Sequence, residues 1–206
     1  MTNLHDQLAG DGARSEAHSA LRAGDVPMEM TGGGWPEGPQ IYAACLASYN
    51  SGILHGCWID AAQEPEELRA AVSAMLTASP IPQAEEFAIH DYQGFGSAPI
   101  GEYTGLDEVA ALAQFIDEHG EDLGGALLEH FGGDLEAARA AFDDYAGSFR
   151  SLADFMEELT EDCGEQIPER LAPYIDYEAM GRDAELSGDV FTIEISFEDV
   201  HVFWSR

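Results

Sequence analysis

Lysine is absent from all 206 residues of this chain, and eight arginines face forty aspartates and glutamates, so the formal net charge is −32. Duplex DNA carries about one negative charge per 1.7 Å of its axis, and a chain this acidic is expected to repel it. Runs of the ~20 apolar residues that span a membrane are also missing, as is the layout of a signal peptide near residue 1. We therefore expect a cytoplasmic protein that binds neither nucleic acid nor membranes.

Cysteine is scarce as well. The three cysteines, Cys45, Cys57 and Cys163, form neither an even disulfide set nor a close pair suited to zinc. We predict that they are reduced packing residues and that the chain holds no metal and no other cofactor.

What the chain does contain indicates that it folds. Apolar residues make up 45% and aromatic residues 10% of it, which is too much for a disordered acidic tail. Its length allows one medium domain or two to three small ones. A charge of −32 equals the phosphate charge of about 16 base pairs, so the protein has enough charge to compete with DNA for a basic groove.

The N-terminal half predicts a tail followed by a small α/β domain. Residues 1–40 are rich in glycine and proline and predict a flexible tail. Residues 41–48 and 53–59 read as the two strands of a hairpin, and Pro65 suits the first turn of a helix. A third strand is expected at 87–92. This region should form an antiparallel sheet with one helix.

The middle of the chain predicts helices. Apolar residues recur at helical spacing in three segments between residues 104 and 146, and glycines follow the first two. Asp134 is placed to cap the third helix, which is expected to carry Tyr145 and to stop at Gly147.

The C-terminal part predicts helices and a short antiparallel sheet. Ser151 begins a capping-box pattern, and residues 174–183 are expected to be helical. Residues 190–197 alternate, with Phe197 on the apolar side, and 200–204 read as a last strand. The fold class predicted for the whole chain is α+β.

The helices between residues 104 and 165 carry dense acidic residues opposite their apolar stripes. Like charges three or four residues apart destabilise a helix, so fold stability does not explain them. They form the candidate acidic surface, whose sixteen residues are Asp107, Glu108, Asp117, Glu118, Glu121, Asp122, Glu129, Asp134, Glu136, Asp143, Asp144, Asp154, Glu157, Glu158, Glu161 and Asp162.

The excess acid is also compatible with proteins of different kinds. A salt-adapted protein carries such an excess, and it could be an enzyme of unknown substrate. An acidic adaptor or chaperone for basic DNA-binding proteins would need charge but no particular shape. Motifs of known catalytic sites were not found, and adjacent acids on a helix diverge by about 100°, which disfavours a magnesium site. We therefore expect no enzyme activity.

Four blocks of sequence, in order, resemble the ArdA antirestriction proteins. The first is IYAACLASYNSGILHGCWID at 41–60, and the second is EFAIHDY at 86–92 followed by IGEY at 100–103. The third, 135–155, has YAGSFRSLADF at its C-terminal end and is similar to the segment called the antirestriction motif. The fourth is YIDYEAMGRD at 174–183.

This resemblance implies an elongated chain of three small domains, here 41–103, 104–146 and 147–206, that forms a homodimer. It implies a mimic of bent DNA that occupies the DNA-binding groove of Type I restriction-modification enzymes and protects incoming mobile genetic elements. Aromatic residues left over by small domains also favour self-association. The predicted dimer contacts are Tyr145, Phe149 and Phe155. The front segment of forty residues is not part of the family pattern.

Overall fold

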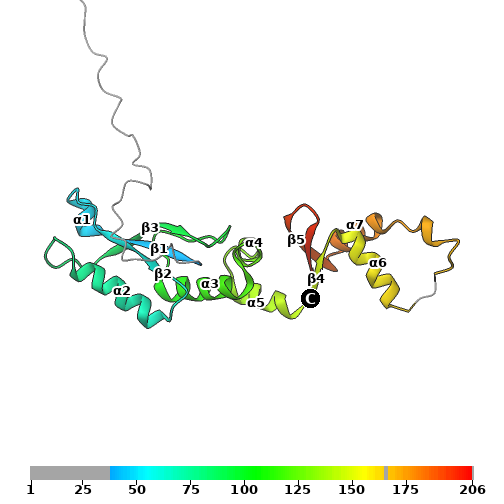
Figure 1. The fold of residues 1–206 in the computed structure, drawn as a ribbon, viewed down its shortest axis with the longest axis horizontal. Coiled ribbons are helices and arrows are strands. Elements are labelled where there is room, and N and C mark those ends of the chain that lie inside the picture. The colour runs from blue at the N-terminus through cyan, green and yellow to red at the C-terminus, as the bar shows by residue number, and fades with distance from the viewer. Residues whose placement is uncertain (1–37, 165–166, 206) are drawn as a thin grey trace, which may run out of the picture. The chain divides into compact units, whose positions relative to one another are not determined.

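A computed structural model describes residues 38–164 and 167–205. Over these residues the fold is α+β, with two three-stranded antiparallel sheets, seven α-helices and one short 3₁₀ helix (Figure 1). Most of the predicted tail lies outside the described residues. No helix in the described part of the chain has the length and apolar character needed to cross a bilayer.

The first sheet has the order β2-β1-β3, with β1 (Gln40–Cys45) paired antiparallel to β2 (Gly56–Asp60) and to β3 (Phe87–Gln93). Gln40 was predicted to end the tail, but it is buried and pairs with both neighbouring strands. The predicted third strand is confirmed.

The predicted first strand is too long, because residues Leu46–Asn50 form the short helix α1. They include no β-branched side chain. The Ser48 hydroxyl lies 2.9 Å from the Ser79 hydroxyl, and the Leu46 amide donates to the Glu86 carbonyl. These contacts fix α1 beside the residues that precede β3 and follow α2, and the return strand begins later than predicted, at Gly56.

The predicted helices of the first two thirds are confirmed. They are α2 (Pro65–Thr77), α3 (Leu106–His119), α4 (Glu121–His130) and α5 (Leu135–Asp143), and Pro65 lies in the first turn of α2. The Asp134 carboxylate accepts a hydrogen bond from the Ala137 amide, so this predicted cap is confirmed. Helix α2 packs on β1, β2 and α3.

The second sheet contains a strand that the sequence analysis did not predict. Its order is β4-β6-β5, where β4 is Tyr145–Phe149, β5 is Val190–Ser196 and β6 is Asp199–Trp204. Tyr145 was predicted to lie on a helix and Gly147 to stop it; both belong to β4. The pairing register shifts between these two residues, and Gly147 has φ 134°, so a bulge hides the alternation that marks a strand.

Two further expectations need correction in the C-terminal part. The helix α7 spans Tyr177–Ser187 and starts after Asp176, which caps it through the Ala179 amide. Tyr174 therefore lies before it, in the 3₁₀ helix η1 (Ala172–Tyr174). Phe197 was predicted to face the apolar side of a strand, but it lies in the turn after β5 and is 88% exposed.

The buried apolar residues form two clusters. The larger one joins the first sheet and helices α2 to α5 with Ile193 and Phe203 of the second sheet. The smaller one consists of Phe155 and Met156 on α6 (Leu152–Asp162) with Val190 and Val202. Cys45 is buried, Cys57 is half-buried and Cys163 is exposed, so a packing role for Cys163 is wrong. The division into three domains stays a prediction.

Helix α4 lies close to the backbone of the loop after β3. A Cβ atom added at Gly125 would lie 2.7 Å from the Phe95 carbonyl oxygen and 3.0 Å from the Ser97 nitrogen. Because both atoms belong to the backbone, no side-chain rotation relieves the clash. Glycine at this position sets how closely an acid-bearing helix approaches the loop that follows the first sheet.

Replacing Gly125 with alanine tests this contact. Helix propensity alone predicts stabilisation by about 1 kcal/mol, whereas the clash predicts destabilisation by about 1–3 kcal/mol. Urea unfolding followed by circular dichroism measures the difference. Gly105→Ala is the matched control, because nothing lies within 4 Å of its added Cβ and its stability should change by less than about 1 kcal/mol. A stabilised Gly125→Ala variant would contradict the proposed packing.

Candidate acidic surface

Fourteen of the sixteen predicted acidic residues are exposed. The two exceptions are half-buried. Asp154 lies in the first turn of α6, where its amide donates to the Ser151 hydroxyl at 3.1 Å. Asp144 follows α5, and its carbonyl oxygen accepts from the Trp204 amide. These two carboxylates are therefore poorer candidates for contact with a partner than the other fourteen.

Burial of one helix face forces the acids outward. On α3 the buried residues include Val109, Leu112 and Ile116, and the acids lie in its first and last turns. On α6 the buried residues are Phe155 and Met156, and four exposed carboxylates follow them. The surface thus results from ordinary amphipathic helices whose polar positions are mostly acidic.

The acids are distributed over the helices without regard to the helix dipole. Carboxylates stabilise the start of a helix and destabilise its end, by about 0.3–1 kcal/mol each at an exposed site. Seven of the sixteen cap a helix or lie in its first turn, where the dipole favours them. Six lie in a last turn, where it opposes them: Asp117, Glu118, Glu129, Asp143, Glu161 and Asp162. Selection for fold stability does not produce this second group.

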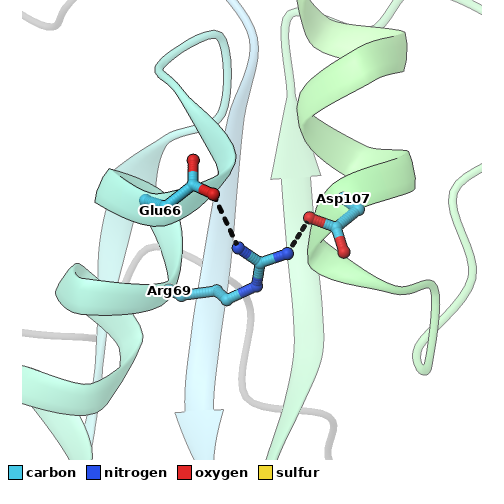
Figure 2. Close-up of polar contacts among 3 residues, drawn as sticks. All are labelled: Glu66, Arg69 and Asp107. Carbon is cyan, nitrogen blue, oxygen red and sulfur yellow. Dashed lines mark hydrogen bonds and ion pairs between the residues drawn. The ribbon is translucent and has the colours of Figure 1, made fainter.

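Arginine partners are few. Within the described ranges, two of the sixteen carboxylates pair with an arginine. Glu136 lies 3.5 Å from Arg139 on the same helix. Asp107 pairs with Arg69, and Figure 2 shows the Arg69 guanidinium between Asp107 of α3 and Glu66 of α2. Arg69 thus connects two helices.

Acidic residues also extend beyond the predicted surface. Sixteen lie in residues 104–164, eight in 38–103 and nine in 167–205. Acids thus make up about one residue in four in 104–164 and in 167–205, and about half that share in 38–103. Acid is thus nearly as dense in 167–205 as in 104–164, so the acidic region extends beyond the candidate surface.

The predicted dimer contacts take part in packing within the chain. Phe155 is 5% exposed and lies with its ring centroid 5.0 Å from that of Phe149. The Tyr145 hydroxyl lies 2.7 Å from Nδ1 of His201. Burial raises the pKa of Tyr145, with a further contribution from Asp199, and burial lowers the pKa of His201. Among the three, Phe155 has almost no surface to offer a second copy.

The potential metal ligands of the described residues are scattered, and no group of three or more of them gathers there. A histidine beside an aspartate can act as an acid–base pair, and His90 and Asp91 are such neighbours in β3. His90 packs edge-on against Tyr49 with ring centroids 4.8 Å apart. The Asp91 carboxylate accepts from the Tyr92 amide. Both residues therefore have structural contacts.

Comparison with protein families finds a match over most of the chain. The family described as antirestriction protein (ArdA) matches residues 41–199. This span runs from β1 to the first residue of β6 and includes all sixteen residues of the candidate acidic surface. A search of curated proteins finds no match.

The helix-end charges can be tested with one matched pair of substitutions. Glu161→Gln removes a carboxylate from the end of α6, and Glu121→Gln removes one from the start of α4. In 10 mM salt, Glu161→Gln should be more stable than Glu121→Gln by about 0.5–1 kcal/mol, because the dipole opposes the first charge and favours the second. Urea unfolding measures the difference. It should shrink in 0.5 M salt, and equal stabilities at low salt would contradict this effect of the dipole.

Proposed function

The chain belongs to the ArdA family of antirestriction proteins, and from this premise we propose that it inhibits Type I restriction-modification enzymes by occupying their DNA-binding groove. In this proposal its carboxylates take the place of DNA phosphates. The protein acts in the cytoplasm, as a stoichiometric inhibitor without catalysis or cofactor, and protects incoming mobile genetic elements from cleavage.

One observation carries the proposal. Exposed carboxylates gather on helices α3 to α6, and most have no arginine partner in the described part of the chain. Six of them lie at helix ends where they cost stability. A basic partner would remove this cost on binding, because each carboxylate would then face a positive charge. The unfavourable charges of the free protein thus become favourable contacts in the complex.

The physical advantage of such a surface is preorganisation. DNA binds basic grooves largely through the release of condensed counterions, so its affinity falls steeply with salt. Carboxylates fixed on packed helices can replace phosphates without further ordering of the backbone, which lowers the entropic cost of binding. The mimic should therefore compete with DNA and share its salt dependence.

Further parts of the proposal follow from the family resemblance. We expect an elongated protein of three small domains that works as a homodimer. Tyr145 and Phe149 are the remaining candidates at the dimer contact, because both keep some exposed surface. A dimer would double the acidic surface offered to an enzyme with a long DNA groove.

The distributed charge can be tested on α6. We expect any single substitution among Glu157, Glu158, Glu161 and Asp162 to change inhibition by less than about threefold, because one exposed ion pair contributes about 0.2–1 kcal/mol. Changing all four to amides should weaken inhibition about tenfold at 0.1 M salt and reduce its salt dependence. The measurement is DNA cleavage by a purified Type I enzyme with increasing inhibitor.

The control removes the same charge elsewhere. Glu67, Glu85, Glu86 and Glu102 are also exposed and lie outside the candidate surface, so changing these four to glutamine should leave most of the inhibition intact. Equal losses from both sets would favour a general acidic character over a defined surface. Loss of all inhibition from one substitution that leaves the protein folded would contradict the distributed charge.

A further inference from the structure

A large aromatic side chain stands at the end of the β5–β6 hairpin. Phe197 is 88% exposed, the highest value among the exposed large apolar residues of the described chain. Exposed glutamates, Glu194 and Glu198, lie on either side of it in the sequence. Single exposed apolar residues are common on protein surfaces, so the exposure of Phe197 gains meaning only together with the turn that carries it.

The turn that presents Phe197 is strained. Phe197 and Glu198 form a two-residue connection, closed by the pair Ser196 and Asp199. Glu198 has φ 62°, a left-handed conformation that glycine or asparagine adopts more readily. Neither residue type is present in the turn. Strained non-glycine residues persist where surrounding contacts fix them, and such residues cluster at binding sites.

Side chains from the neighbouring strand fix this turn. Arg150, directly after β4, donates to the Glu198 carboxylate at 2.7 Å. Ser148 of β4 donates to the Asp199 carboxylate at 2.7 Å, and Nε2 of His201 lies 3.4 Å from the same oxygen. The carboxylates of the two residues that follow Phe197 thus have three polar contacts. These contacts restrain the turn that carries the ring, which lowers the conformational entropy lost on binding.

We propose that Phe197 is an aromatic anchor that enters an apolar pocket on the basic surface of the target enzyme. This inference rests on the proposed function. Aromatic side chains surrounded by polar groups are typical hot spots of protein interfaces. Glu198 is already paired with Arg150, but the nearby exposed Glu194 and the net charge of −32 favour a positively charged surround on the partner, which the walls of a DNA-binding groove provide.

A second copy of this chain fits the turn less well than a basic partner does. Contact between two such hairpins would bring Glu194 of both copies together, while Glu198 of each copy is already paired with Arg150. Each copy carries a net charge of −32, so this contact would add to a repulsion already large. DNA is excluded by the same argument. A basic protein surface is the occupant that the charges favour.

Phe197→Ala tests the anchor, with affinity for a purified Type I enzyme measured between 0.1 and 0.3 M salt. The variant should bind about tenfold more weakly at every salt concentration, with the slope of log Kd against log salt unchanged. The reason is that apolar contacts are not screened by ions, whereas charge contacts are. Leu186→Ala is the matched control, because Leu186 is 84% exposed on another element, and its affinity should stay within twofold of the unchanged protein.

Arg150→Gln distinguishes binding that depends on the aromatic anchor from binding that depends on charge alone. The substitution makes the protein more acidic, so purely electrostatic binding predicts equal or tighter affinity. It also removes the contact to Glu198, so the anchor predicts binding several-fold weaker than that of the unchanged protein. Circular dichroism confirms that each variant keeps its helices.

The outcomes are distinguishable. Failure of the unchanged protein to bind the enzyme would overturn the proposed function and the anchor with it. Tight binding by the unchanged protein with equal affinity for Phe197→Ala would overturn the anchor alone. Conversion of a dimer to a monomer by Phe197→Ala, seen by sedimentation velocity, would place Phe197 between copies and overturn the assignment to the enzyme.

Discussion

Carboxylates three or four residues apart on one helix repel each other, and the other interactions of the fold must offset this repulsion for the helix to form. On α6 the exposed Glu157, Glu158, Glu161 and Asp162 form such pairs, and within the described ranges no arginine pairs with them. The helix persists because Phe155 and Met156 pack into the smaller core cluster and Ser151 caps its start. Apolar burial therefore has to offset a surface that opposes folding.

Two arginines of the described residues connect separate elements. Arg69 links α2 to α3, and Arg150 links the end of β4 to the β5–β6 turn. Arg139 pairs with Glu136 on its own helix. A chain with so few positive charges leaves most of its carboxylates available to a basic binding partner. Because ion pairs between elements are then few, each one matters more for the relative placement of the two elements that it links. The scarcity of positive charge therefore bears both on the acidic surface and on the ion pair beside the proposed aromatic anchor.

The sequence predicted helices well because their signals are local. The apolar spacing of α3 and α4 and the Asp134 cap lie within single segments. Strand β4 was not predicted, because its partner strand β6 lies about fifty residues away in the sequence and the bulge at Gly147 breaks the alternation of apolar and polar residues. The exposed acids could be predicted from helical periodicity. The half-burial of Asp144 and the exposure of Phe197 could not, because both depend on the second sheet.

Binding of this protein and of DNA to the enzyme must be mutually exclusive if carboxylates stand in for phosphates. The most direct measurement titrates a Type I enzyme with a fluorescent DNA duplex at increasing concentrations of this protein. Mimicry predicts that the apparent Kd for DNA rises in proportion to inhibitor concentration, without a ceiling. A plateau in the apparent Kd, showing a complex that holds DNA and inhibitor together, would contradict it.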